Sequence, residues 1–383
     1  MSQTYKNRTH ELQRRMADEA ADVFLFDDPD SVFYFSGYCG YVGLELGRPT
    51  ILVIPRCGEP TLITPGMEAE MARAMTWVHD IREWTDGVDG EWMKHVPAVL
   101  SGRAGLTIML EPLKSYPKLV ELVRKNISAK IIDGTPLISS MRMIKTTDEI
   151  AIMRQAGKVA VAMVEAGRAA LIEGTPEYEV ALAIIAAGTR QAAQFLSPTG
   201  EDQYISPTIY GLQVLQSGHE TSMVHRRSTV KQIKAGDPVY FCFCGIANFK
   251  QFKLGFDREF FVRTVTDEQA QTYETARRAQ QAALATIRPG VVAEDVHAAA
   301  QEVYRSAGFG ISYRTGRGIG YSSLEDPQFK SGDKTKLKAG MTFAVDGGIT
   351  VAGKFGTRLG DSVVVTENGY EYLTNYPRDL AIV

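Results

Sequence analysis

The stretch MRMIKTTDEIAIMRQAGKVAVAMVEAG, residues 141–167, separates two parts of the chain that differ in character. A threonine pair followed by Asp148 and Glu149 is a helix-start signal, because a hydroxyl caps the first free amides and acidic groups favour the positive end of a helix. The apolar residues that follow predict a long amphipathic helix ending near Leu171. We therefore expect a domain boundary at about residue 145.

The two sides of this boundary predict different folds. Before it, short strand-like runs alternate with helical ones, which favours an α/β arrangement around a central sheet. After it, β-type segments such as PVYFCFCGI (238–246) precede helices near 267–287 and 293–307, and further strands follow. This order is typical of an α+β domain with a curved, mostly antiparallel sheet. The sequence predicts two domains, residues 1–145 and 146–383, and an α+β fold.

Composition and charge exclude several classes of protein. The net charge is −3 and no basic run is present, which argues against a nucleic-acid partner. The N-terminus lacks the pattern of a signal peptide, and no apolar run approaches the length of a membrane span. We expect a cytoplasmic protein that acts on a small molecule and contacts no membrane.

The four cysteines include a close pair, Cys242 and Cys244. Residues two apart on a strand point to the same face, so a metal or redox pair is geometrically possible. Buried cysteines that act as small hydrophobic residues are commoner, and we interpret the pair in that way. The small number of cysteines agrees with a reducing compartment.

Several segments of the chain resemble one family of enzymes. These are residues 141–160 and the ordered motifs GDPVYFCFCG (236–245), LGFDREFFV (254–262), TGRGIGY (315–321), KAGMTFAVDGGI (338–349) and TRLGDSVVVTENG (357–369). Together they resemble the creatinase, aminopeptidase P and prolidase family, which has the "pita-bread" fold. The resemblance covers nearly the whole chain. It implies an N-terminal creatinase-like domain and a C-terminal catalytic domain.

The resemblance also identifies the positions at which metal-dependent members bind two metal ions. Those members use two aspartates, a histidine and two glutamates, ligands that suit divalent cations activating water. The corresponding residues of this chain are Cys242, Gly255, Arg317, Asp346 and Gly360. Only Asp346 keeps the character of such a ligand, and an arginine brings positive charge to a cation site. We therefore expect no metal and no other cofactor.

Creatinase, a member that hydrolyses creatine without a metal, shares further local matches. The resemblance assigns Arg48 in ELGRPTILV to the substrate carboxylate and His225, at the end of QSGHETSMVH, to catalysis. It places Asp257 and Asp346 at two glutamates that contact a guanidinium group. Imidazole exchanges protons near neutral pH, so His225 is expected to activate water and protonate the leaving nitrogen.

From this match we expect a metal-independent hydrolase of a C–N bond in a small guanidino or amidine compound that bears a carboxylate. Asp257 and Asp346 would stabilise its cationic form. Arg317 would hold the substrate carboxylate or neutralise the aspartates, and Tyr321 would line the pocket. The resemblance also implies a homodimer in which the partner's N-terminal domain completes the active site.

Other interpretations of the same residues remain open. His225 is by default a solvated loop residue, Asp257 is adjacent to Arg258 and would pair with it, and Arg48 and Arg317 would be surface arginines. Three other functions also remain. They are an Xaa-Pro peptidase-type metallohydrolase, a lyase of a small zwitterion, and a non-catalytic family member that acts as a binding module.

Overall fold

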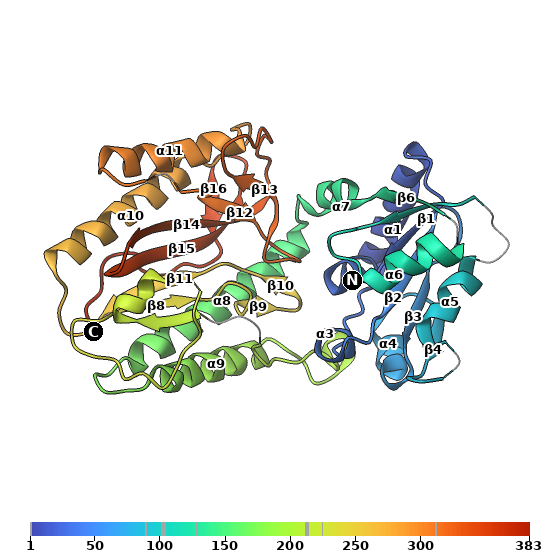
Figure 1. Cartoon of the computed structure of the whole chain (residues 1–383), viewed down its shortest axis with the longest axis horizontal. Helices are drawn as coiled ribbons and strands as arrows, with labels where there is room; N and C mark the ends of the chain where they lie inside the picture. The colour runs from blue at the N-terminus through green and yellow to red at the C-terminus, as the bar shows by residue number, and fades with distance from the viewer. Residues whose placement is uncertain are drawn as a thin grey trace. The chain divides into compact units, whose positions relative to one another are not determined.

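The computed structural model describes residues 2–88, 90–100, 105–127, 129–210, 214–223, 225–310 and 312–383. The chain forms two compact units, Met1–Met141 and Arg142–Val383 (Figure 1). The units thus meet between residues 141 and 142, whereas the sequence predicted 145 and 146. The predicted α+β class with two domains is confirmed.

The N-terminal unit is built on a six-stranded mixed sheet in the order β4-β3-β2-β1-β5-β6. The strands are β1 (Val23–Phe26), β2 (Ile51–Pro55), β3 (Thr61–Pro65), β4 (Asp80–Trp84), β5 (Thr107–Leu110) and β6 (Lys130–Asp133). The helices are α1 (Ser2–Asp18), α2 (Pro29–Ser36), α3 (Val42–Leu46), α4 (Ala69–Met75), α5 (Glu91–Leu100), α6 (Pro117–Leu122) and α7 (Thr135–Arg142). The central strand β1 pairs antiparallel with β2 and parallel with β5.

The sequence of β1, VFLF, explains why it lies at the centre of this sheet. Successive side chains of a strand point to opposite faces, so an all-apolar strand needs cover on both sides. Val23 and Leu25 belong to the core formed with α5 and α6. On the other face Phe24 and Phe26 stack with ring centroids 4.0 Å apart, and Phe26 meets Phe35 of α2.

The C-terminal unit begins as the sequence predicted. Helix α8 (Thr147–Ala170) follows Thr146, whose hydroxyl accepts a hydrogen bond from the amide of Glu149. The Glu149 carboxylate accepts one in return from the amide of Thr146, at 2.6 Å, which completes a capping box. Helix α9 (Glu177–Ala193) packs against α8.

The sheet of this unit is antiparallel, in the order β13-β12-β14-β15-β11-β8-β7, with β16 beside β15. The strands are β7 (Val214–Ser217), β8 (Pro238–Cys242), β11 (Asp257–Phe261), β12 (Gly316–Gly318), β13 (Glu325–Phe329), β14 (Thr342–Val351), β15 (Phe355–Val365) and β16 (Tyr370–Tyr372). A hairpin of β9 (Asn248–Phe249) and β10 (Phe252–Lys253) connects β8 to β11.

Two further helices, α10 (Asp267–Thr286) and α11 (Ala293–Ser306), pack together beside β14 and β15 (Figure 1). The contact is close, since a Cβ atom on Gly347 of β14 would lie 2.3 Å from the carbonyl oxygen of Ala276 in α10. Glycine at this position therefore lets the helix approach the sheet. Alanines of α10 and apolar residues of β14 and β15 form the core between them.

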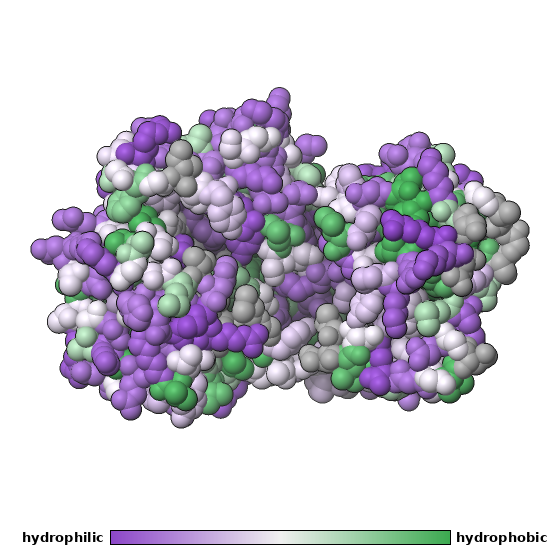
Figure 2. Space-filling model, in the orientation of Figure 1, coloured by the Kyte–Doolittle hydropathy of each residue, from purple (hydrophilic) through white to green (hydrophobic). Residues whose placement is uncertain are grey.

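The visible surface of both units is largely hydrophilic, with hydrophobic side chains in separate spots (Figure 2). Exposed large apolar residues such as Leu113 and Val230 are far apart in the sequence. None of the helices in the described ranges is long and apolar enough to cross a membrane.

Candidate functional site

Four positions on four strands form one row across the C-terminal sheet. Cys242 of β8 lies opposite Asp257 of β11, and Asp257 lies opposite Gly360 of β15. Gly360 in turn lies opposite Asp346 of β14. Residues directly opposite one another in an antiparallel sheet project to the same face. The register therefore brings Cys242, Asp257 and Asp346 to one face, with Gly360 leaving a gap between the two carboxylates.

The carboxylates converge on that gap. A Cβ atom on Gly360 would lie 2.7 Å from Oδ1 of Asp346 and 2.9 Å from Oδ2 of Asp257. Asp257 is buried, with 5% of its surface exposed, whereas Asp346 is partly exposed. Oδ1 of Asp346 has no hydrogen-bond partner among the described residues. The row thus presents two carboxylates, and Oδ1 of Asp346 is available to accept a hydrogen bond from a bound molecule.

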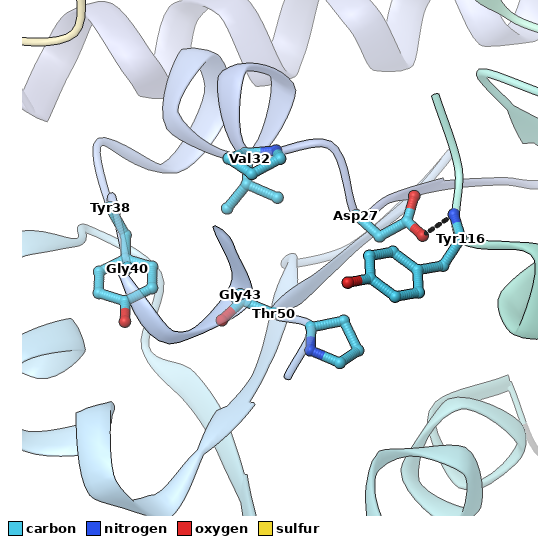
Figure 3. Close-up of a pocket in the computed structure, with 9 residues that line it drawn as sticks. Asp27, Val32, Tyr38, Gly40, Gly43, Thr50 and Tyr116 are labelled. Carbon is cyan, nitrogen blue, oxygen red and sulfur yellow. Dashed lines mark hydrogen bonds between the residues drawn. The ribbon is translucent and has the colours of Figure 1, made fainter. Parts of the chain in front are cut away.

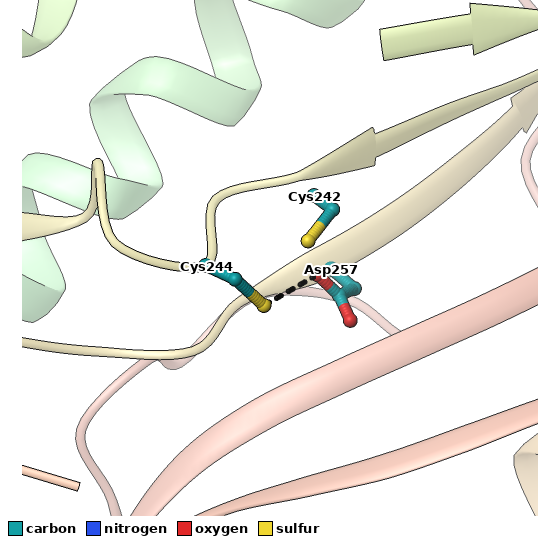
Figure 4. A group of neighbouring side chains, drawn as sticks. All are labelled: Cys242, Cys244 and Asp257. Carbon is teal, nitrogen blue, oxygen red and sulfur yellow. Dashed lines mark hydrogen bonds between the residues drawn. The ribbon is translucent and has the colours of Figure 1, made fainter. Parts of the chain in front are cut away.

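Two thiols lie beside Asp257 (Figure 4). One ligand atom each from Cys242, Cys244 and Asp257 can be chosen so that all lie within 4.8 Å of one another. Sγ of Cys244 is 3.9 Å from Oδ1 of Asp257. The pair that the sequence analysis interpreted as apolar filling therefore lies next to the buried carboxylate.

The side chain of Arg317, in β12, points into the same site. Its guanidinium donates to Oδ2 of Asp346 at 2.9 Å and to Sγ of Cys244 at 3.1 Å, while its Nε donates to the carbonyl of Ser323 at 2.8 Å. Its side chain is only 8% exposed. The interpretation of Arg317 as a surface arginine is therefore wrong, and its predicted role in neutralising an aspartate agrees with this geometry.

Burial and charge perturb the titration of the whole group. Burial, with the negative charge of Asp346, raises the pKa of Asp257 to about 6. A hydrogen bond with Cys244 and burial raise the pKa of the Cys242 thiol. Burial opposes the charge on Arg317, but Asp346 and then Cys244 outweigh it and raise its pKa. Strong perturbation of several neighbouring groups is typical of functional sites.

Asp257 does not pair with the adjacent Arg258. The two residues point to opposite faces of β11, as alternation requires. Arg258 instead forms a buried ion pair with Asp361 at 2.8 Å. The alternative of a local salt bridge is thus excluded, and the carboxylate of Asp257 is directed toward the cysteines.

The structure also describes the surroundings of Gly255, the position that the resemblance assigned to the second metal-binding aspartate. Asp257, not Gly255, lies opposite Cys242 in the sheet register. A Cβ atom on Gly255 would lie 2.6 Å from Cβ of Ala344 and 3.0 Å from a guanidinium nitrogen of Arg317. The glycine therefore makes room for the arginine, and the carboxylate of this segment is Asp257.

The remaining predicted residues lie elsewhere. His225 is exposed in a bend beyond η4 (Gly218–Ser222) and makes no hydrogen bond within the described residues. Tyr321 is 2% exposed, packs on Phe252 and donates its hydroxyl hydrogen bond to Glu149, so it is a core residue and not part of a pocket wall. Sequence patterns alone gave no means of separating Tyr321 from residues that face the site.

Arg48 belongs to the N-terminal unit, where it forms an ion pair with Asp86. That unit also has a cavity of about 230 Å³ lined by residues of the first 50 positions and Tyr116 (Figure 3). Asp27 of this cavity accepts a hydrogen bond from the amide of Tyr116 at 2.6 Å, and burial raises its pKa to about 6. Neither this cavity nor Asp27 was predicted, because its lining residues come from two helices and the loops around them and form no sequence motif.

The donor set of the C-terminal site does not fit a pair of hard divalent ions. Such ions prefer oxygen ligands and imidazole, whereas here two of the donors are thiols and Gly360 offers no side chain. The guanidinium of Arg317 stands among the donors, bonded to Asp346 and Cys244.

Comparison with known proteins identifies the family. The model of metallopeptidase family M24 matches residues 151–367, and that of the creatinase/prolidase N-terminal domain matches residues 8–144. The chain belongs to the metallopeptidase family M24. The resemblance stated from the motifs is thereby confirmed.

Relatives of this M24 protein include enzymes of more than one kind. It is 31% identical to the agropine synthesis cyclase of Rhizobium rhizogenes, over 98% of this chain and 96% of the relative. It is 27% identical to the Xaa-Pro dipeptidase of Pyrococcus furiosus, over 98% and 99%. The solved prolidase of Thermococcus sibiricus matches with a TM-score of 0.86 at 25% identity, over 99% of both chains.

These findings contradict the expected creatinase-like function. The family is one of metallopeptidases, and relatives such as the Xaa-Pro dipeptidase act on peptides, so a metal-independent amidinohydrolase is the wrong prediction. The coarser prediction, a hydrolase of the pita-bread fold, agrees with the family. The prediction was wrong because it followed local matches to creatinase, whereas the family model and the relatives over the whole chain are those of peptidases.

Proposed function

We propose that this M24 protein hydrolyses the amide bond of a small, dipeptide-sized substrate at the row of Cys242, Asp257, Gly360 and Asp346. The observation that carries the proposal is the convergence of the Asp257 and Asp346 carboxylates on the gap at Gly360. Support comes from the peptidase relatives. The substrate class comes from their names alone.

The side chains suit distinct tasks. Oδ1 of Asp346 has no hydrogen-bond partner in the part of the chain that the structure describes, so it can accept hydrogen bonds from a substrate ammonium group. Asp257, with a pKa of about 6, exchanges protons near neutral pH. It would take a proton from the attacking water as oxygen bonds to the carbonyl carbon. It would return that proton to the nitrogen as the C–N bond breaks.

Arg317 holds this arrangement in place. Its ion pair with Asp346 fixes the orientation of that carboxylate, and its charge offsets part of the repulsion between the two aspartates. A guanidinium has five N–H donors, so donors remain beyond the three hydrogen bonds described. One of these would bind the developing oxyanion of the substrate carbonyl.

A panel of dipeptides, with Xaa-Pro sequences included, tests the proposal. The purified full-length protein, supplied in turn with Zn²⁺, Mn²⁺ and Co²⁺, should release free amino acids that mass spectrometry detects. Asp257→Asn should lower turnover by about 100-fold or more. Asp295→Asn serves as the comparison, because Asp295 is exposed in the first turn of α11. A folded wild-type protein that cleaves no dipeptide under any of these conditions rules the proposal out.

A second function, ring closure within one small molecule, has a specific observation in its favour. The agropine synthesis cyclase is 31% identical over 98% of this chain, and the site departs from a dinuclear donor set. In a cyclase, a nucleophile of the substrate itself replaces water. The product masses separate the two cases, since hydrolysis adds one water to the substrate and dehydrative cyclisation removes one.

A further inference from the structure

We propose that Cys242, Cys244 and Asp257 form a mononuclear site for a thiophilic divalent cation, zinc being the best match, in the place where the family's resemblance predicts two harder ions. The proposal concerns metal binding: with the ion bound, Asp257 would be an ionised ligand, so its role in proton transfer described above applies to the metal-free site. It assigns a function to the cysteine pair, which the proposed function does not use.

The distances fit one tetrahedral ion. Zinc bonds of about 2.3 Å to sulfur and about 2.0 Å to oxygen place sulfur and oxygen ligands about 3.5 Å apart. Sγ of Cys244 and Oδ1 of Asp257 are 3.9 Å apart, and the three ligand atoms lie within 4.8 Å of one another. Cys244 lies just beyond the end of β8, so small side-chain rotations there are not opposed by strand pairing.

The environment of Asp257 is a second, independent observation. Its carboxylate is buried, yet its hydrogen-bond contacts are with the two thiols, which are weak donors. A buried carboxylate ordinarily has charged or amide donors around it, because desolvation is costly. A cation bound between the carboxylate and the thiols would supply the missing interaction. Figure 4 shows the three side chains directed toward one another.

In a metal-bound site, Arg317 would position the sulfur ligand of Cys244 and would not block the ion. Its N–H group is 3.1 Å from Sγ of Cys244, so it can hydrogen-bond this sulfur and hold the side chain in one orientation. Two thiolates, one carboxylate and a divalent cation leave one net negative charge. The neighbouring guanidinium is already paired with Asp346, so with one bound ion the site keeps that single negative charge.

The coordination number has a further consequence. Three protein ligands leave the fourth tetrahedral position open, as in catalytic zinc sites, whereas structural sites use four. Oδ1 of Asp346 and Oδ2 of Asp257 both lie within 3 Å of the point that a Cβ of Gly360 would occupy. The open position would therefore have carboxylate acceptors close by.

The test measures binding without relying on activity. Full-length protein is purified under reducing conditions, stripped with a chelator and titrated with zinc, and bound metal is determined by mass spectrometry. We expect one zinc per chain. Cobalt in place of zinc should give a thiolate-to-metal charge-transfer band and the visible bands of tetrahedral geometry. Cys57→Ser is the matched control, because this free cysteine is exposed in the N-terminal unit.

Substitutions distinguish the residues that bind zinc from a residue that only contacts them. Cys244→Ser and Asp257→Asn should each abolish stoichiometric zinc binding, with Cys244→Ser weakening the charge-transfer band, while circular dichroism shows that the variants remain folded. Arg317→Met should retain the band but weaken zinc binding about 10- to 100-fold, as loss of a ligand's partner does. Three outcomes overturn the proposal. They are zinc binding unchanged in Cys244→Ser, two manganese ions bound without a thiolate band, and a Cys242–Cys244 disulfide in protein kept reduced.

Discussion

Replacing Asp257 with asparagine should stabilise the metal-free protein at neutral pH. Burial and the charge of Asp346 raise the pKa of Asp257 from its ordinary value of 3.8 to about 6. The folded chain therefore binds this proton more tightly than the unfolded chain does. Stability from this group is fully present below pH 4 and is lost as pH rises toward 6. The loss corresponds to about 3 kcal/mol at pH 7, which asparagine avoids because it carries no charge.

The measurement must report on the C-terminal unit. The three tryptophans, at positions 77, 84 and 92, all lie in the N-terminal unit, so fluorescence would follow the wrong domain. Hydrogen exchange read by mass spectrometry on peptides of β8, β11 and β15 follows the site itself. In chelator-treated protein, the free-energy difference between Asp257→Asn and wild type should be near zero at pH 4 and about 3 kcal/mol at pH 7.

A control and a contrary result complete this test. Asp295→Asn, at an exposed position in the first turn of α11, should show no comparable dependence on pH. If Asp257→Asn destabilises the metal-free protein at pH 7, the carboxylate has favourable partners that its described contacts do not provide. The view of Asp257 as a buried and poorly compensated charge would then be wrong.

Three further predictions concern the framework around the site. Asp361→Ala leaves the buried Arg258 without its ion pair and should lower the free energy of unfolding by about 3–5 kcal/mol, measured by hydrogen exchange of β11 and β15. Gly347→Ala places a Cβ atom 2.3 Å from the carbonyl of Ala276 and should cost about 1–3 kcal/mol by the same measurement, whereas Gly369→Ala, with open space around it, should change little. Thr146→Ala removes the cap of α8 and should cost about 1 kcal/mol, seen as faster exchange in its first turn, and unchanged exchange would contradict the capping role.

The sequence predicted those features that depend on local pattern. The helix start at Thr146, the α+β class and the family all follow from short-range signals or ordered motifs, and the structure and comparisons agree with them. Predictions about which side chains meet rested on the resemblance alone. The motif match directed Asp257 and Asp346 to one pocket, and the register of β8, β11, β15 and β14 shows that they lie on one face of the sheet, together with Cys242.

The surroundings of His225 and Tyr321 were also not predictable from the sequence. The resemblance assigned both residues by position, whereas exposure and burial are properties of the folded chain. His225 lies in an exposed bend and Tyr321 lies in the core. For the cysteine pair, the spacing left both a site and apolar filling open, and the nearby carboxylate, thirteen residues from Cys244, became visible only in the folded chain.

The residues that replace the family's metal ligands pack against one another, so these replacements are not independent. Gly255 leaves space for the guanidinium of Arg317, and Gly360 leaves space for the carboxylates of Asp257 and Asp346. Restoring one ligand alone should therefore be harmful. Gly360→Glu would force its Cβ to within 2.7 Å of Asp346 Oδ1 and add a third carboxylate to a buried acidic group. We expect a loss of about 2 kcal/mol or more in metal-free protein and no gain of manganese binding. If the variant binds two manganese ions at unchanged stability, the packing of Gly360 against the two aspartates does not restrict this position, and the reasoning is wrong.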